Sequence, residues 1–256
     1  MLEFYGEKPS WDGPFEFVEV KRALSPTNFP RVTHSLNPYG GCEHGCIYCY
    51  AVGYTHSDLS RWRVVRVRRN IVDRLSKELP AVSGRVGIGT STDPYQYAEG
   101  RFRLTRSCID LLRDRGVPYT VLTKSDLVLR DIDILSESDC TVSVTLTNID
   151  DRVSRMTEPG APLPSQRLKA VGELCDSGID TVVLIAPVMS SLEGHEEELV
   201  RRIADTGVRK VTCDPLNIRN VDTSRLDRMG IGRSVTAMER LLHHGRVHGL
   251  DISDDY

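Results

Sequence analysis

The feature that most constrains the fold of this chain is a regular alternation of short apolar runs with longer amphipathic segments. The runs are rich in β-branched residues and apolar on both faces, and the segments between them carry apolar residues at helical spacing. This order predicts a parallel sheet covered by helices. The expected strands are 31–37, 85–91, 118–124, 140–146, 180–187 and 208–215, and the expected helices are 71–79, 105–116, 165–178 and 195–207.

The number of these units limits the architecture further. About six β/α units are too few for a closed eight-fold barrel, so either an open doubly wound sheet or an incomplete barrel is expected. No internal repeat and no clear linker divides the chain, and a helical segment near the C-terminus reads as an appendage of the same domain. In both architectures functional groups gather at the carboxyl ends of the parallel strands.

Composition indicates the setting in which the chain works. The 256 residues carry a net charge of −3, so binding to nucleic acid would need a local basic patch. The sequence contains no apolar run of membrane-spanning length and no secretory signal pattern at its start, which predicts a cytoplasmic protein. In that reducing environment its seven cysteines are not expected to form a disulfide framework.

Three of the cysteines lie within eight residues, in the stretch NPYGGCEHGCIYCYAVGYTH. Cys42, Cys46 and Cys49 follow a C-x3-C-x2-C spacing in a glycine-rich segment. Three thiolates can hold a four-iron cluster and leave its fourth iron open to another ligand. The alternatives are a zinc site completed by His44 or His56, and three unconnected cysteines.

The cysteine motif, with an aromatic residue before its last cysteine, resembles the signature of the radical S-adenosylmethionine (SAM) superfamily. Further stretches resemble its spore photoproduct lyase-like branch, also called DNA repair photolyase-like. They are SLNPYGGCEHGCIYCYA, GTSTDPYQYAE, LTKSDLVLRDIDIL, TEPGAPLPSQRLKAV and GIDTVVLIAPV. The resemblance implies that the three cysteines hold a [4Fe-4S] cluster whose open iron chelates SAM. Reductive cleavage of SAM would then give a 5′-deoxyadenosyl radical that abstracts hydrogen from a substrate.

The resemblance also implies an α/β fold, a partial (β/α)6 barrel of radical SAM type with a short C-terminal helical appendage. On this basis residues 1–33 are expected to form an N-terminal extension that packs on the barrel. Residues 34–215 would form the radical SAM core, and residues 216–256 the C-terminal appendage of the same domain.

Several positions match the SAM-binding segments of the family. Thr90 and Ser91 match the region that binds the methionyl end, and Lys124 matches a lysine used on the SAM carboxylate. The remaining matches are Ser143 and Thr145 on the ribose-binding strand, and Ala186, Pro187 and Tyr48 near adenine. For each residue the alternative is a strand residue that only packs or caps.

One departure from the branch concerns the hydrogen donor. Spore photoproduct lyases place a donor cysteine just after the second strand, whereas this chain has GTSTDPYQ there. Thymine-dimer reversal by the same thiol is therefore not expected. Tyr95 or Tyr97 could donate a hydrogen or a proton, could stack on a substrate, or could merely pack the loop. Asp93 and Gln96 are candidate substrate contacts at the same mouth, and Cys213, near the end of the last strand, is a candidate catalytic thiol.

The most basic stretch, RWRVVRVRRN (61–70), follows the cysteine segment. If it is a strand, Arg61 and Arg63 share one face, and Arg66 and Arg68 share the other. Arginines beside a tryptophan suit a phosphate backbone and a stacked base. A solvated edge strand explains them equally well.

Three functions remain open on the sequence. The first is a radical enzyme, lyase- or transferase-like, that acts on a nucleic acid, and the second is a radical enzyme that modifies a peptide, protein or small metabolite. The third is a non-catalytic zinc-binding interaction module. Either radical enzyme would need a reductant such as a flavodoxin or a ferredoxin, and the sequence does not define the oligomeric state.

Overall fold

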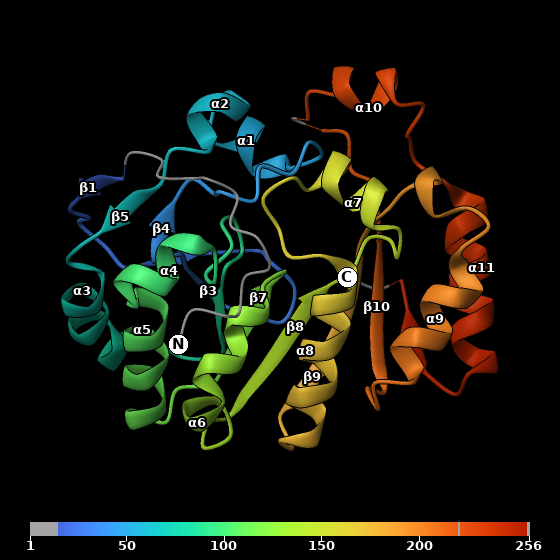
Figure 1. The fold of residues 1–256 in the computed structure, drawn as a ribbon. Coiled ribbons are helices and arrows are strands. Elements are labelled where there is room, and N and C mark those ends of the chain that lie inside the picture. The colour runs from blue at the N-terminus through green and yellow to red at the C-terminus, as the bar shows by residue number, and fades with distance from the viewer. Residues whose placement is uncertain (1–14, 220, 255–256) are drawn as a thin grey trace.

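The structure is a computed structural model that describes residues 15–219 and 221–254. Its centre is a sheet in the order β11-β10-β9-β8-β7-β6-β3-β2, in which β2 alone runs antiparallel to its neighbour (Figure 1). Within the described residues this sheet is open, with β2 and β11 at its edges. The strands are β2 (Leu24–Pro26), β3 (His34–Leu36), β6 (Val86–Ile88), β7 (Tyr119–Thr123), β8 (Cys140–Thr145), β9 (Asp180–Val188), β10 (Lys210–Pro215) and β11 (Asp251–Ser253).

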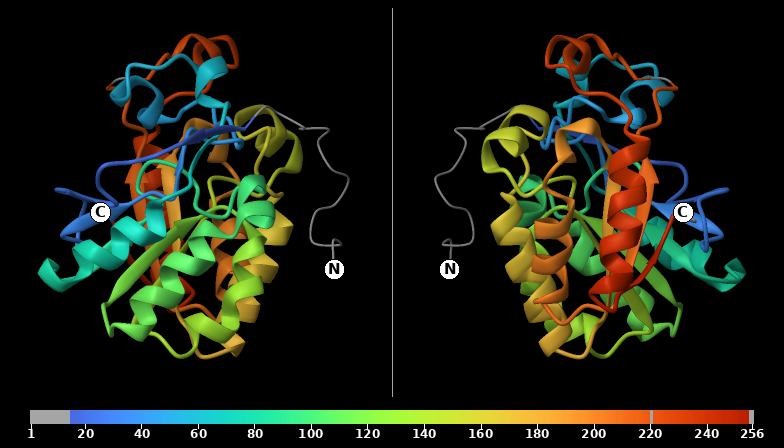
Figure 2. Two further views of the ribbon diagram at one scale, coloured as in Figure 1. Left: turned by 90° about the vertical axis from the view of Figure 1, so that its left-hand side faces the viewer. Right: turned by 90° about the vertical axis from the view of Figure 1, so that its right-hand side faces the viewer.

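All six predicted strands are present, and the predicted helices lie between them. In space α3 packs beside α5, and α9 beside α11, so that the helices form a layer over the outer face of the sheet (Figure 2). The long helices are α3 (Ile71–Glu78), α5 (Leu104–Asp114), α8 (Pro164–Asp176), α9 (Glu196–Ala204) and α11 (Val235–Val247). The expected helical C-terminal part is confirmed by α11, but β11 was not predicted and adds a seventh parallel strand.

The core lies between the sheet and this helical layer. Val121, Val142 and Val183 on neighbouring strands are fully buried together with Ile109 of α5 and Leu199 of α9. β8 is buried along most of its length, with Cys140, Val142 and Val144 on one face and the hydroxyl residues Thr141, Ser143 and Thr145 on the other. Of the described helices, none is both long enough and apolar enough to cross a bilayer.

Most of the shorter elements surround the end of the sheet where the strands finish. Two of them, η1 and α6, lead into the starts of β6 and β8 and lie at the opposite end. A second sheet has the order β1-β5-β4, and residues 15–33 contribute β1 to this sheet and β2 to the main one. The prediction of residues 1–33 as an N-terminal extension includes 1–14, which lie outside the described residues. These elements are β1 (Glu16–Val18), β4 (Tyr39–Gly40), β5 (Arg66–Arg68), α1 (Tyr50–Tyr54), α2 (Leu59–Trp62), η1 (Leu79–Ala81), α4 (Tyr97–Phe102), η2 (Asp126–Asp131), α6 (Ile132–Leu135), α7 (Asp151–Thr157), η3 (Ser190–Leu192) and α10 (Ser224–Arg228).

The basic stretch differs from its predicted form. Arg61 lies in the short helix α2 and Arg63 follows that helix, so the predicted strand is confined to Arg66–Arg68. This strand, β5, is central in the small sheet, because β1 pairs with one side of it and β4 with the other. The expectation of one solvated edge strand that carries all four arginines is therefore wrong.

Candidate active site

One cavity, of about 200 Å³, lies where the parallel strands end. The ends of β6, β7, β8, β9 and β10 all contribute to its lining, as does the segment that joins β4 to α1. This is the location that parallel α/β folds give to functional groups. The predicted residues that line it are Cys42, Cys46, Tyr48, Cys49, Thr90, Ser91, Asp93, Lys124, Thr145, Ala186 and Pro187.

The three cysteines of the motif border this cavity from a single loop, residues 41–49, which we call the cysteine loop. Cys42 and Cys46 are buried, and Cys49 is half-buried. The loop begins at Gly41, which has a φ of +79°, and a Cβ at this position would lie 2.5 Å from the backbone oxygen of Val64. Only glycine tolerates both the positive φ and this close approach, and the turn at Gly41 places Cys42 at the cavity.

Burial keeps the three thiols in their neutral form when no metal is bound. Burial raises the pKa of Cys42 well above its usual value and raises the pKa of Cys46 to about 12. Burial also raises the pKa of Cys49, although the amide groups of Ala51 and Val52 at the start of α1 oppose this change. Thiols in such surroundings ionise when a metal replaces the proton. Three of them on one cavity therefore fit a four-iron cluster with one open iron.

The histidines considered for a zinc site lie apart from a common ligand position. His44 is buried at the cavity, with its Nδ1 3.3 Å from the carboxylate of Asp93, whereas His56 is exposed and outside the lining. Within residues 15–219 and 221–254, no three His, Cys, Asp or Glu side chains converge as ligands of a single metal ion. The described residues thus contain no assembled zinc site.

Lys124 directly follows β7 and reaches the cavity beside the cysteine loop. Its Nζ lies 5.7 Å from the centre of the Tyr48 ring. Burial disfavours the ammonium group, but the negative charges of a Cys46 thiolate and of Glu158 outweigh that effect and raise the pKa of Lys124. Lys124 thus presents its amino group to the cavity next to the cysteines.

Asp93 organises the chain around Lys124. Its carboxylate accepts hydrogen bonds from the Lys124 amide at 2.7 Å, from the Thr123 hydroxyl at 2.7 Å and from the Tyr95 amide at 2.9 Å. The same carboxylate faces His44. Asp93 was predicted as a substrate contact, and it lines the cavity, but most of its acceptor capacity is used within the protein.

The hydroxyl residues of the predicted SAM site fall into two groups. Thr90 and Ser91 line the cavity, where Asn37 accepts from the Ser91 amide at 3.1 Å and donates to the Thr90 hydroxyl at 3.3 Å. Thr145, at the end of β8, also lines it. Ser143 lies two residues earlier on the same face of that strand, is buried, and is outside the lining.

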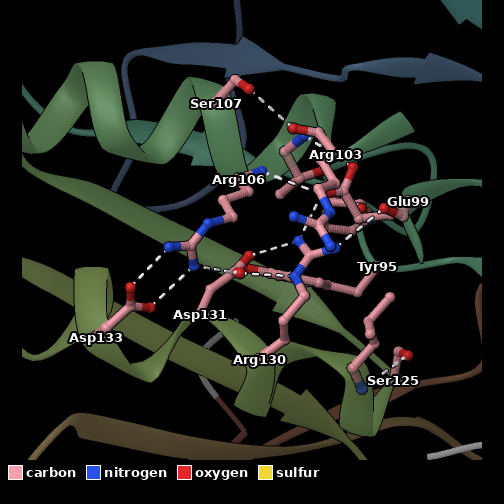
Figure 3. A network of polar contacts seen from close by, with 12 residues as sticks. Tyr95, Glu99, Arg103, Arg106, Ser107, Ser125, Arg130, Asp131 and Asp133 are labelled. Carbon is pink, nitrogen blue, oxygen red and sulfur yellow. Dashed lines mark hydrogen bonds and ion pairs between the residues drawn. The ribbon is translucent and has the colours of Figure 1, made fainter. Parts of the chain in front are cut away.

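The two tyrosines proposed as hydrogen donors lie outside the cavity lining. Tyr95 is fully buried, and its hydroxyl donates to Asp131 at 3.1 Å within a network of polar contacts that also includes Arg130 and Glu99 (Figure 3). Tyr97 is the first residue of α4 and is half-buried. Because the Tyr95 ring faces this network instead of the cavity, its predicted catalytic role is corrected to a structural one.

Gln96 and Cys213 are likewise placed differently from expectation. Gln96 is fully buried, accepts from the Glu43 amide and donates to the Gly41 carbonyl, so it fastens the cysteine loop rather than contacting a substrate. Cys213 is fully buried in the main core, and Asp214, the next residue, reaches the cavity in its place. Neither Gln96 nor Cys213 belongs to the lining.

None of the four predicted arginines lines the cavity. Arg68 donates to the Asn37 carbonyl at 2.9 Å, and the Arg66 side chain lies against Gly40. The side chain of Arg63 lies against Gly45 of the cysteine loop, and Arg61 is exposed on α2. Of the four predicted arginines, Arg63, Arg66 and Arg68 therefore support the surroundings of the cysteine loop, and Arg61 is exposed to solvent.

Several residues at the site were not identified from the sequence. Tyr50, Phe29 and Asn217 line the cavity at its mouth, and Tyr50 remains 45% exposed. Asn37 was present in the recognised stretch SLNPYGG without being assigned a role. Behind the loop lie two fully buried charged residues, Glu158 and Arg167.

Comparisons with known proteins show the family to which the chain belongs. The family model described as "Radical SAM superfamily" matches residues 36–203. An uncharacterized protein of Mycobacterium tuberculosis is 36% identical over 234 residues, covering 82% of this chain and 68% of that protein. A protein of Methanocaldococcus jannaschii, also uncharacterized, is 30% identical over 180 residues and covers 68% of each chain. The "Radical SAM Nalpha-GlyT isomerase" of Pseudomonas phage M6 is 26% identical over 178 residues, covering 66% of this chain and 36% of the isomerase.

Solved structures show the same fold. Spore photoproduct lyase complexed with dinucleoside spore photoproduct matches with a TM-score of 0.67 at 16% identity, covering 92% of this chain and 80% of the lyase. SuiB of Streptococcus suis bound to S-adenosylmethionine matches with a TM-score of 0.54 at 13% identity, covering 86% and 48%. The predicted partial barrel is confirmed by these matches.

Proposed function

Because this chain belongs to the radical SAM superfamily, we propose that Cys42, Cys46 and Cys49 hold a [4Fe-4S] cluster at which SAM is cleaved. The observation that carries the proposal is the convergence of all three cysteines on the cavity that Lys124 also enters. When bound, the cluster and SAM supply the 5′-deoxyadenosyl radical that removes a hydrogen atom from the substrate.

The residues of the chain bind and orient the reactants. Lys124 would pair with the carboxylate of SAM, because its ammonium group lies at the cavity and such pairs of opposite charge form strong hydrogen bonds. Thr90 and Ser91, oriented by Asn37, would hydrogen-bond the methionyl end. The buried walls of the cavity limit the access of water to a reactive carbon radical.

We propose a nucleic acid as the substrate. The mouth of the cavity carries two aromatic rings, Phe29 and Tyr50, and the amide of Asn217. Aromatic faces stack on unpaired bases, and an amide can hydrogen-bond the edge of a base. One structural neighbour points the same way, because it is a lyase solved with a dinucleoside.

The fate of the substrate radical differs from that in the lyase-like branch. After β6 the chain has Gly89, Thr90, Ser91, Thr92 and Asp93, so no thiol stands at the expected donor position. The proposal is therefore a lyase- or transferase-type reaction completed without that cysteine. The electron would come from a reductant such as a flavodoxin or a ferredoxin.

An anaerobic assay of SAM cleavage tests the choice of substrate. Reduced protein with SAM should form more 5′-deoxyadenosine when a short single-stranded oligonucleotide is added than when an unrelated peptide is added. Tyr50→Ala should weaken oligonucleotide binding by about tenfold, since stacking of one base on an aromatic ring is worth ~1–3 kcal/mol. Tyr54→Ala is the matched control, because Tyr54 lies at the other end of α1, is 72% exposed and is outside the cavity lining. Stimulation by the peptide alone would favour a peptide substrate instead.

A further inference from the structure

Behind the cysteine loop lies an ion pair that the mechanism does not use. Glu158 follows α7, Arg167 lies in α8, and the side chains of both are completely buried. The guanidinium group of Arg167 donates to the carboxylate of Glu158. Neither residue lines the cavity, so neither is placed to touch SAM or a substrate.

Both charged groups make further contacts that lead to the cavity. The carboxylate of Glu158 accepts hydrogen bonds from the hydroxyl of Tyr48 and, at 2.9 Å, from that of Thr147. Arg167 donates to the carbonyl of Pro162 at 2.8 Å and to that of Thr145 at 3.2 Å. The pair thus connects Tyr48, in the cysteine loop, to the end of β8.

The backbone beside Glu158 is also fastened to the cysteine loop. The Ile47 amide donates to the Thr157 carbonyl at 2.9 Å, and the Gly160 amide donates to the His44 carbonyl at 2.9 Å. A Cβ at Gly160 would lie 2.2 Å from the backbone oxygen of Glu43, so only glycine allows this approach. These bonds hold the loop on both sides of Cys46.

A second buried triad of the same residue types provides a comparison. Glu99 is fully buried, accepts from the Tyr39 hydroxyl at 2.5 Å and pairs with Arg130 at 2.7 Å (Figure 3). Tyr39 lies in β4, before the loop, and is outside the cavity lining. The two triads share their residue types and a fully buried glutamate, although Arg130 is partly exposed and also pairs with Asp131. Only the triad of Glu158 holds a tyrosine that borders the cavity.

We infer that Glu158 and Arg167 are positioning residues that fix the cysteine loop and the Tyr48 ring over the cavity before any cofactor is bound. The inference deepens the proposed function and rests on it for its link to SAM. Two buried opposite charges are costly to desolvate, and replacing such a pair by apolar residues is often neutral or stabilising. General stability is thus a weak explanation for the pair, whereas its direct contact with Tyr48 gives it a specific role.

The first part of the test uses the metal-free chain. Amide hydrogen exchange of residues 42–49, measured by mass spectrometry, should become at least about tenfold faster in Glu158→Gln, because the loop then opens locally. Glu99→Gln is the matched control and should leave exchange in this segment within about twofold of wild type. Equal exchange in wild type and Glu158→Gln, or equal acceleration by both variants, would overturn the inference.

The second part uses the iron-loaded, reduced protein and its electron paramagnetic resonance spectrum. Adding SAM should change the spectrum of wild type and of Glu99→Gln in the same way, and should change it less in Glu158→Gln. Tyr48→Phe keeps the ring and removes only the hydroxyl, so it should reproduce part of the Glu158→Gln effect without a comparable loss of thermal stability. An unaltered SAM response in both Glu158→Gln and Tyr48→Phe would contradict a positioning role. If wild type takes up no iron, the proposed function fails, while the exchange experiment still decides whether the pair holds the loop.

Discussion

The ammonium nitrogen of Lys124 lies 5.7 Å from the centre of the Tyr48 ring, so a strand end and the cysteine loop meet across the cavity. The two residues are separated by most of the first half of the chain, and each is held by a carboxylate. Asp93 accepts from the Lys124 backbone, and Glu158 accepts from the Tyr48 hydroxyl. The positions of the proposed SAM ligands are therefore set by buried acids that do not themselves need to contact SAM.

Removing the Lys124 charge should weaken SAM binding and leave iron loading intact. A hydrogen bond to a charged group contributes about 1.5–3 kcal/mol, so Lys124→Ala should raise the dissociation constant for SAM by about 10- to 100-fold. Lys210→Ala is the control. Lys210 and its partner Asp180 are the first residues of β10 and β9, so they lie at the ends of these strands that point away from the cavity. Calorimetric titration of each iron-loaded variant with SAM measures its dissociation constant. A dissociation constant for Lys124→Ala equal to that of wild type would remove Lys124 from the site.

The close approach of Gly160 to the cysteine loop predicts opposite effects for two glycine substitutions. Gly160→Ala places a methyl group against the Glu43 carbonyl and should lower the free energy of unfolding by roughly 1–3 kcal/mol. In Gly172→Ala the new Cβ lies 3.9 Å from the nearest atom, the Thr206 oxygen, inside helix α8. That variant should gain about 0.5–1 kcal/mol. Urea unfolding of the metal-free chain compares them, and equal stabilities would show that the loop does not pack against Gly160 as described.

The Glu158–Arg167 pair predicts a pH dependence of stability. Burial opposes ionisation of Glu158, but the charges of Arg167 and Lys124 hold its pKa at about 2, below the ordinary 4.5. Since the pKa is lower in the folded chain, ionised Glu158 stabilises the fold fully above pH 4.5, and this contribution is lost as the pH falls toward 2. The difference in unfolding free energy between wild type and Glu158→Gln should therefore shrink over that interval.

The matching control for the pH experiment is Glu173→Gln. The Glu173 carboxylate is partly exposed and lies 3.6 Å from Lys169 in the same helix, so its loss should change stability by less than about 1 kcal/mol. If the difference in unfolding free energy between wild type and Glu158→Gln stays constant from pH 6 to pH 3, the fold does not hold Glu158 in its charged form.

The parts of the structure that could be predicted from sequence depend on local patterns. The cysteine loop is compact in sequence, so its motif identified three cavity residues at once. Lys124 was predicted because it matches a lysine of the family, and its position at the end of an apolar run agrees with that match, since residues at the ends of parallel strands meet. The helix that contains Arg167 was also predicted. The burial of the Arg167 side chain was not predicted, because an arginine in an amphipathic helix is expected to be exposed to solvent. Its partner Glu158 lies in a loop, where periodicity gives no signal.

The residues that were misplaced follow from ambiguities of strands and turns. Cys213 shares one face of β10 with Val211, and both are buried in the main core, whereas Asp214 on the other face lines the cavity. The prediction relied on the position of Cys213 near the strand end and did not use this alternation. Tyr95 follows β6 closely, but Asp93 accepts its amide and turns the chain, and the ring then meets Asp131. The basic stretch alternates arginine with apolar residues, and the helix α2 within it was set by Asp58, which accepts from the Arg61 amide.

The most direct test of the central claim measures iron and 5′-deoxyadenosine together in anaerobically prepared protein. Wild type should bind about four irons per chain, and should release 5′-deoxyadenosine from SAM when reduced. Cys46→Ala should lose both properties, whereas Cys108→Ala, which alters a buried cysteine of helix α5, should keep them. Wild type without iron, or Cys46→Ala that still forms 5′-deoxyadenosine, would contradict the account.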